Sequence, residues 1–104
     1  MSYTIGMNTI ETTPTYDRWH DRLTDNIAKK RIAARIRQAE VAGNFGDCEP
    51  VGEGVFEMRI HYGPGYRVYC KRSGRAVYVL LAGGDKSTQT KDIQTALKLA
   101  RQLG

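Results

Sequence analysis

Hydrophobic and polar residues alternate along residues 55–86, and glycine, proline and serine interrupt the alternation at two places. A period of two is typical of half-buried β-strands, whose successive side chains point to opposite faces of a sheet. The interruptions, at residues 63–65 and 73–74, contain residues that favour tight turns. The pattern therefore predicts two antiparallel hairpins that share a middle strand.

The turn positions predict a register for both hairpins. Tyr62 and Tyr66 flank the first loop and are expected to be its last facing pair, and the second turn places Cys70 beside Val77. In this register one face of the sheet is apolar. The other face carries Glu57, Arg59, His61, Arg67, Tyr69 and Lys71. Glu57 is expected to face Lys71 as a surface ion pair of little energetic weight.

The N-terminal third of the chain is expected to be mostly helical. Residues 1–12 have isolated apolar positions among threonines and are compatible with an edge strand. Thr13 and Pro14 are typical of an N-cap and a first helical residue. A second helix is predicted over residues 26–42, because apolar residues recur there at helical spacing and Gly43 can end it.

The remaining segments complete the predicted fold. Residues 43–54 hold four glycines and a proline and are predicted to be a loop. Residues 77–82 are nearly all apolar, which predicts a strand covered on both faces. Ser87 or Thr88 is expected to cap a C-terminal helix. The predicted fold class is α+β, an antiparallel sheet with two N-terminal helices and a C-terminal helix.

Length and composition narrow the class of protein. The 104 residues are expected to form one domain, 1–104, with 16 Lys and Arg against 11 Asp and Glu and a net charge of +5. This charge favours an anionic partner such as nucleic acid. Cys48 and Cys70 lack metal-binding spacing and are expected to be reduced thiols, and no metal or other cofactor is expected. No membrane-spanning run or signal-peptide pattern is present, so a cytoplasmic location is expected.

Two runs of sequence resemble a known family. They are GNFGDCEPVGEGVFEMRIHYGPGYRVYCK, residues 43–71, and LLAGGDKSTQTKDIQTA, residues 80–96. In this order they look like the RelE/ParE toxin superfamily, and in particular its HigB-like group of addiction module killer proteins. The resemblance implies a small toxin with helices on one side of its sheet. It also implies an oligomeric complex with a cognate antitoxin, often a helix-turn-helix protein.

The resemblance also implies site residues. In the RelE branch the open face of the sheet holds messenger RNA on the ribosome, and basic residues promote its cleavage without metal. Arg67 matches the key arginine of that family, Arg59 stands where the family has a lysine, and Lys86 falls near another basic position. Glu57 stands where RelE has a second lysine.

The chemistry of RNA transesterification fits the same polar face. A 2'-hydroxyl must lose a proton, the pentacovalent phosphate must be stabilised and the leaving oxygen must gain a proton. Arg59 and Arg67 are expected to bind the scissile phosphate, with support from Lys86, because guanidinium holds two oxygens and stays charged. Either His61 or Tyr69 is expected to exchange the proton or to stack on a base. The expected RNA-binding set is Arg59, Arg67, Tyr69, Lys71 and Lys86.

The leading hypothesis is the toxin of a type II toxin–antitoxin system that acts as a ribosome-dependent, metal-independent mRNA endoribonuclease and inhibits translation. Two alternatives fit the same residues. One is a ParE-like inhibitor of DNA gyrase without nuclease activity, since ParE proteins are also basic. The other is a noncatalytic RNA-binding domain, which the acidic residue at position 57 favours.

Overall fold

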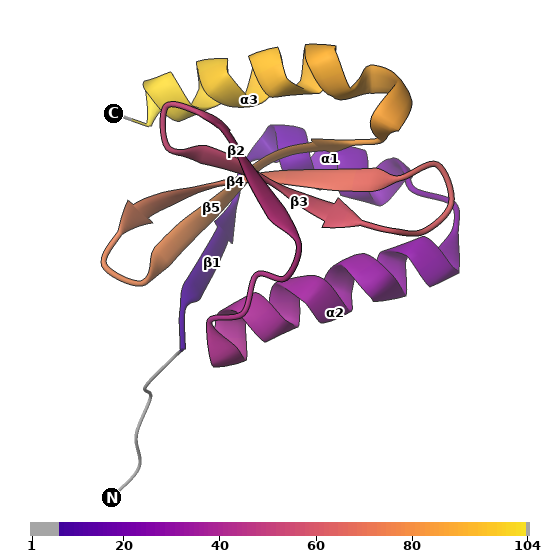
Figure 1. Ribbon diagram of the computed structural model, residues 1–104, viewed down its shortest axis with the longest axis horizontal. Coiled ribbons are helices and arrows are strands. Elements are labelled where there is room, and N and C mark those ends of the chain that lie inside the picture. The colour runs from indigo at the N-terminus through magenta and orange to yellow at the C-terminus, as the bar shows by residue number, and fades with distance from the viewer. Residues whose placement is uncertain (1–6, 104) are drawn as a thin grey trace, which may run out of the picture.

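A computed structural model describes residues 7–103 and shows a five-stranded sheet with three α-helices (Figure 1). The elements follow the chain as β1 (Thr9–Thr12), α1 (Pro14–Arg22), α2 (Asn26–Ala42), β2 (Cys48–Gly52), β3 (Val55–Ile60), β4 (Tyr66–Gly74), β5 (Val77–Gly84), a single 3-10 turn η1 (Lys86–Thr88) and α3 (Gln89–Gln102). The α+β class is therefore confirmed.

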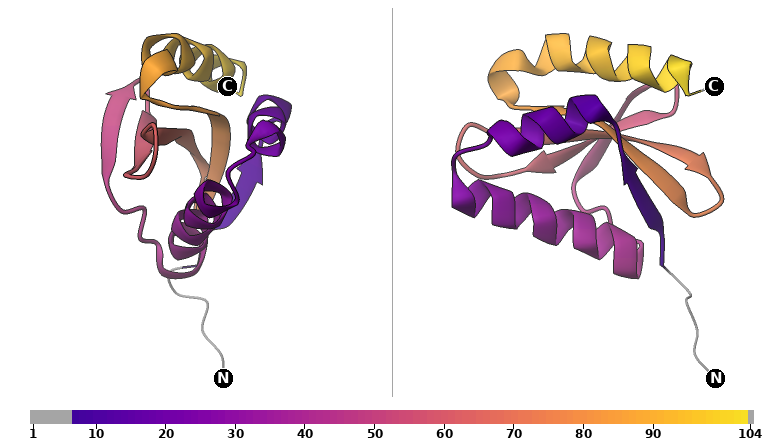
Figure 2. Two further views of the ribbon diagram at one scale, coloured as in Figure 1. Left: turned by 90° about the vertical axis from the view of Figure 1, so that its right-hand side faces the viewer. Right: turned by 180° about the vertical axis from the view of Figure 1, so that it is seen from behind.

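The sheet is mixed rather than wholly antiparallel. Its strand order is β1-β5-β4-β3-β2, and β1 runs parallel to β5 while the other neighbours are antiparallel. The helix α3 lies along one face, and α1 and α2 pack against the other (Figures 1 and 2). The resemblance implied that all helices lie on one side of the sheet, and this expectation is therefore wrong.

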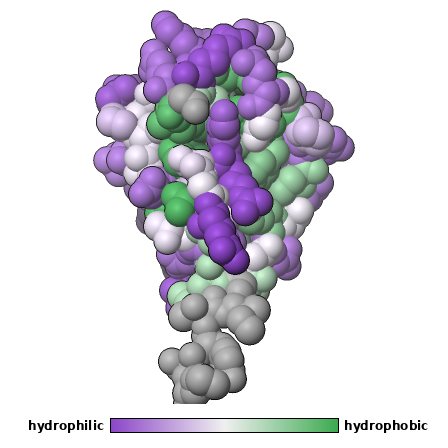
Figure 3. Space-filling view, turned by 90° about the vertical axis from the view of Figure 1, so that its left-hand side faces the viewer, coloured by the Kyte–Doolittle hydropathy of each residue, from purple (hydrophilic) through white to green (hydrophobic). Residues whose placement is uncertain are grey.

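Each face of the sheet has its own core. On the α3 side, Ala96, Leu97 and Ala100 pack against Tyr69 and Leu81. On the other side, Tyr16 of α1 and Ile32 of α2 pack with inward residues of three strands, among them Met58, Val68 and Leu80. On the outer face shown in Figure 3, green hydrophobic patches alternate with purple hydrophilic residues.

Local signals place the helix ends as expected. The Thr13 hydroxyl accepts a hydrogen bond from the Tyr16 N–H at 3.1 Å, and Pro14 is the first helical residue. The carboxylate of Asp25 accepts hydrogen bonds from the N–H groups of Ile27 and Ala28 in α2. That helix spans the predicted residues 26–42. Gly43 ends it in the left-handed conformation, with φ at 68°.

The register of the first hairpin differs from the prediction by two residues. The last facing pair is Ile60 and Tyr66, and Arg59 stands opposite Arg67. Tyr62 leaves the strand because its hydroxyl donates to Asp25 at 2.8 Å, which pulls the residue toward α2. A shift of two residues keeps every side chain on its predicted face.

The second hairpin changes the faces of β5. Its turn lies at residues 75–76 instead of 73–74, and Cys70 pairs with Leu80 rather than sitting beside Val77. Leu80 therefore faces α1 and α2, and Val79 and Leu81 face α3. The hydrophobic pattern could not choose between these registers, because β5 is apolar on both sides, as predicted.

The glycine-rich segment 43–54 contains a strand that the sequence did not reveal. Cys48–Gly52 forms β2 and pairs with β3 at the edge of the sheet. Pro50 is tolerated there because an edge strand has one side without ladder hydrogen bonds.

After β5, Asp85 caps η1 by accepting a hydrogen bond from the Ser87 N–H at 2.8 Å, and α3 begins after Thr88.

The two cysteines are both free, Cys70 in the core and Cys48 half-buried. Among residues 7–103, no helix is long and apolar enough to cross a membrane.

The close approach of α1 to the end of β5 generates a stability prediction. A Cβ at Gly83 would lie 2.2 Å from a ring carbon of Trp19. Gly83→Ala is therefore expected to lower the free energy of unfolding by about 1–3 kcal/mol, measured by urea denaturation. Gly74→Ala is the matched control, since its Cβ would meet Val77 at an ordinary 3.8 Å. Equal stability of both variants would show that the indole does not pack on Gly83 in solution.

Candidate nucleic-acid interface

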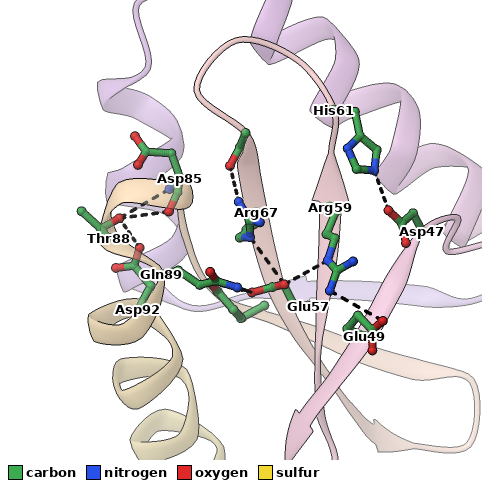
Figure 4. Close-up of polar contacts among 12 residues, drawn as sticks. Asp47, Glu49, Glu57, Arg59, His61, Arg67, Asp85, Thr88, Gln89 and Asp92 are labelled. Atoms are coloured by element: carbon green, nitrogen blue, oxygen red, sulfur yellow. Dashed lines mark hydrogen bonds and ion pairs between the residues drawn. The ribbon is translucent and has the colours of Figure 1, made fainter.

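A buried carboxylate lies at the centre of the polar cluster on the α3 side of the sheet (Figure 4). Glu57 of β3 is 1% exposed and accepts hydrogen bonds from the Tyr69 hydroxyl at 3.0 Å and the Gln89 amide at 2.9 Å. It also forms ion pairs with Arg59 at 3.3 Å and Arg67 at 3.4 Å. The prediction of a surface pair between Glu57 and Lys71 is therefore wrong.

The strand register brings the two arginines together. Arg59 of β3 and Arg67 of β4 are directly opposite each other, and each places its Nε next to the same oxygen of Glu57. Their side chains keep 33% and 13% exposure, so both can reach a ligand. Arg59 also approaches the exposed Glu49 of β2 at 3.6 Å.

The electrostatics of the cluster keep Glu57 charged. Burial alone raises the pKa of its carboxyl, but hydrogen bonds from Gln89, Tyr69 and Arg59, with the charge of Arg67, outweigh burial and hold this pKa below its usual range. Burial, followed by the charge of Glu57, raises the pKa of Tyr69 well above its usual value. Tyr69 is therefore a hydrogen-bond donor to Glu57 and remains protonated.

Lys86 lies beside Arg67 because the hairpin loop holds both. The Lys86 N–H donates to the carbonyl of Pro64 at 3.4 Å, and Arg67 Nη1 donates to the carbonyl of Gly65 at 2.8 Å. Gly65 has a φ of +79°, and a Cβ there would lie 3.3 Å from Arg67 Nη1 and 3.6 Å from Lys86 Cβ. The glycine thus leaves room for the two cations to flank the loop.

His61 lies on the other side of the cluster, past the end of β3. Its Nε2 is 2.5 Å from the Asp47 carboxylate, and Figure 4 shows this pair near Arg59 rather than Arg67. The hydrogen bond to His61, with smaller contributions from nearby charges, holds the pKa of Asp47 below its usual range. The guanidinium of Arg35 donates to the carbonyl of Arg59 and, at 3.2 Å, to that of Asp47. Arg35 therefore ties α2 to the backbone that carries this pair.

The structure divides the predicted site residues into three groups. Arg59 and Arg67 lie together at Glu57, the backbone of Lys86 contacts the hairpin loop beside Arg67, and His61 lies past the end of β3. Tyr69, expected on an open face, is 0% exposed and covered by α3. Lys71 of β4 stands opposite Val55, the first residue of β3. It is four strand residues from Arg67, a distance of roughly 13 Å.

Sequence reasoning missed three residues of the cluster. The central role of Glu57 was mistaken for a surface contact, and Gln89 and Asp47 were not singled out. Asp47 and His61 are 14 positions apart, and Glu57 and Gln89 are 32 positions apart. No local pattern connects residues at such separations, although a glutamate two residues before Arg59, on the same face of the strand, is a usable signal. Among residues 7–103, no group of three or more His, Cys, Asp or Glu side chains could hold a metal ion.

The cluster fits a negatively charged ligand. Two guanidinium groups lie next to each other at one buried carboxylate, and their side chains remain partly exposed. Guanidinium forks match the oxygens of phosphate. The arrangement is therefore suited to hold a phosphodiester.

Comparison with known proteins identifies the family. The model described as "Phage derived protein Gp49-like (DUF891)" matches residues 19–103, and the chain belongs to this family. Members of the family are often toxins of toxin–antitoxin systems, and some are associated with endoribonuclease activity. The assignment to the RelE/ParE superfamily and its HigB-like group is wrong, because Gp49-like proteins are a distinct toxin family.

A relative from Haemophilus influenzae (strain ATCC 51907 / DSM 11121 / KW20 / Rd) is 50% identical over 95 residues, which cover 91% of this chain and 95% of the relative. Its printed description, "Uncharacterized protein", states no activity. The two proteins are therefore similar over nearly their full lengths.

The charge of Glu57 generates a prediction about stability and pH. Glu57→Gln removes the counter-charge of two partly buried arginines, so at pH 7 the free energy of unfolding is expected to fall by about 2–4 kcal/mol. Because the folded-state pKa is depressed, this contribution is complete above the unfolded pKa of about 4.3 and is lost as pH falls through the folded-state pKa.

Urea denaturation between pH 7 and pH 2.5 tests this prediction. The stability difference between wild type and Glu57→Gln is expected to shrink in the acidic part of the range. Glu49→Gln is the control, since its carboxylate is exposed and its loss is expected to cost less than about 1 kcal/mol. A pH-independent difference between wild type and Glu57→Gln would contradict an ionised Glu57.

Proposed function

We propose that this chain is a toxin that cleaves RNA, acting on messenger RNA at the ribosome, and that a cognate antitoxin neutralises it. The observation that carries the proposal is the pair of facing arginines, Arg59 and Arg67, held by one buried carboxylate with their side chains partly exposed. Membership of a family in which toxins are frequent supports it.

In the proposed mechanism, Arg59 and Arg67 bind the nonbridging oxygens of the scissile phosphate. The 2'-oxygen of the preceding ribose attacks phosphorus, and the bond from phosphorus to the 5'-oxygen breaks. The arginines and Lys86 stabilise the additional charge on the pentacovalent phosphate. Expected products are a 2',3'-cyclic phosphate and a 5'-hydroxyl.

Proton transfer is assigned to the margin of the cluster. Asp47 holds His61 through Nε2, which leaves Nδ1 free to accept the proton of the 2'-hydroxyl. The second proton transfer, to the leaving 5'-oxygen, is assigned to the ammonium of Lys86, whose backbone N–H contacts the loop beside Arg67. Tyr69 and Gln89 act as positioning residues, because they contact Glu57 rather than the exposed surface.

A noncatalytic RNA-binding role is the second candidate. The specific observation in its favour is that Glu57 neutralises part of the arginine charge and Tyr69 is buried, which leaves few groups for proton transfer. RNA bound but left intact is the result that distinguishes this candidate.

Primer extension on a defined message in a purified translation system tests the proposal. Wild-type protein is expected to cut the message at discrete positions when ribosomes are present. Arg67→Ala is expected to lower the cleavage rate by about 10²-fold, because one charged donor to the transition state is lost. A message whose scissile nucleotide lacks the 2'-hydroxyl is expected to remain intact.

Arg72→Ala is the matched control, because Arg72 lies on the same strand but at its exposed far end. Cleavage by this variant at the wild-type rate is expected. Intact messages with wild-type protein, or unchanged cleavage by Arg67→Ala, would falsify the proposed nuclease site.

A second pair of variants tests the proton-transfer assignment. His61→Ala is expected to reduce single-turnover cleavage by about 10²-fold, within the usual range for general acid–base catalysis. Asp47→Asn is expected to have a smaller effect, because it retains the imidazole and loses only the group that orients it. RNA affinity is expected to change little in both variants, and full activity of His61→Ala would show that another group takes the proton.

A further inference from the structure

Two polar helix faces meet at the end of β5. On α1 the face consists of Thr15, Arg18, Trp19 and Arg22, and on η1 and α3 it consists of Thr88, Lys91, Asp92 and Thr95. Both sets have the spacing i, i+3, i+4, i+7, which places their members on one side of a helix. Together they line a cleft of about 460 Å³.

The cleft exists because β1 is shorter than its neighbour. β1 ends with Thr12 opposite Leu80, whereas β5 continues to Gly84. The helices α1 and α3 come from opposite faces of the sheet and border this uncovered end of β5 (Figure 2). The residues Gly83 and Gly84 lie between the two helix faces and form the floor of the cleft.

The side chains that line the cleft leave room only for glycine at positions 83 and 84. A Cβ at Gly83 would strike the Trp19 ring, and a Cβ at Gly84 would lie 1.8 Å from an Asp92 carboxylate oxygen. The Trp19 indole and the Asp92 carboxylate therefore lie directly on the backbone. Trp19 is the only tryptophan of the chain, and its half-buried ring forms part of the cleft wall.

The charge of the cleft is available to a ligand. Arg18, Arg22 and Lys91 form no ion pair with another residue in the range 7–103. The two carboxylates of the cleft are engaged within it, Asp85 with the Ser87 N–H and Asp92 with the Thr88 hydroxyl at 2.5 Å.

The cleft is also continuous with the arginine cluster. Asp85 and Thr88 line it and flank Lys86, whose backbone N–H contacts the hairpin loop next to Arg67. A strand bound at Arg59 and Arg67 could therefore pass over Lys86 and enter the cleft.

We propose that this cleft binds a nucleotide of the RNA strand adjacent to the scissile phosphate. Arg18, Arg22 and Lys91 neutralise the backbone phosphate. The indole of Trp19 provides a surface for a base, and the threonine hydroxyls can bind the ribose or base edges. The volume is within the range of small-ligand pockets. That the strand is RNA rests on the proposed function.

Intrinsic fluorescence tests the site, because the only tryptophan forms part of it. Titration of the full chain with a single-stranded RNA hexanucleotide is expected to quench Trp19 saturably. The double variant Arg18→Gln/Arg22→Gln is expected to bind at least about 10-fold more weakly. Arg37→Gln/Arg72→Gln, which removes two exposed arginines elsewhere, is expected to bind like wild type. Lys91→Gln, on the opposite wall, provides an independent variant should the double variant not fold.

Parallel titrations separate the possible ligands and the two proposals. Arg59→Ala/Arg67→Ala is expected to abolish cleavage yet keep saturable quenching of Trp19. Unchanged affinity of the double variant and of Lys91→Gln overturns the cleft, even if wild type cleaves RNA. Quenching by inorganic phosphate as strong as by RNA overturns a nucleotide site, and equal affinity for the matched DNA overturns the assignment to RNA. Cleft-dependent RNA binding without cleavage by wild type overturns the nuclease and leaves the cleft assignment supported.

Discussion

The structure of the candidate site depends on one buried ion cluster, in which Glu57 holds Arg59 and Arg67 side by side. Two like charges on directly opposite strand positions repel each other, so this pairing requires a counter-charge. A buried carboxylate in turn requires several donors, and Tyr69 and Gln89 supply the ones that the arginines do not. Stability and the proposed phosphate binding are thus coupled through the same carboxylate, and the arginines are oriented before a ligand arrives.

Closure of the sheet on both faces confines ligand binding to its margins. The helix α3 covers the part of the polar face that carries Tyr69, and α1 and α2 bury the other face. The accessible margin of the sheet lies around the start of α3. There β5 ends, the loop between β3 and β4 turns, and Lys86 stands at the start of η1. Family membership agrees with a role as a toxin, and the cations of this margin are the physical basis for the proposal that its target is RNA.

The margin combines surfaces with different chemistry on either side of η1. On one side the paired arginines present rigid guanidinium groups, with the pair of Asp47 and His61 next to Arg59. On the other side the cleft between α1 and α3 offers cations around Trp19 that form no ion pair with another residue of the range 7–103. Oriented groups suit a transition state, whereas unpaired cations and an indole suit the tolerant binding of a flanking strand. Both surfaces depend on glycines, Gly65 on one side and Gly83 on the other, that let side chains approach the backbone.

Elements whose signals are local could be predicted from the sequence alone. Thr13 and Pro14 began α1, the apolar period and Gly43 bounded α2, and the alternation along β3 and β4 assigned their faces correctly even though the register was off by two residues. The faces of β5, the strand β2 and the burial of Glu57 depend on contacts between distant segments, and only the three-dimensional fold revealed them. A strand that is apolar on both sides carries no preference for either face, and a Gly- and Pro-rich edge strand has the composition of a loop. A charged residue becomes buried only when donors from distant segments surround it, and for Glu57 one of these donors, Gln89, lies 32 positions away.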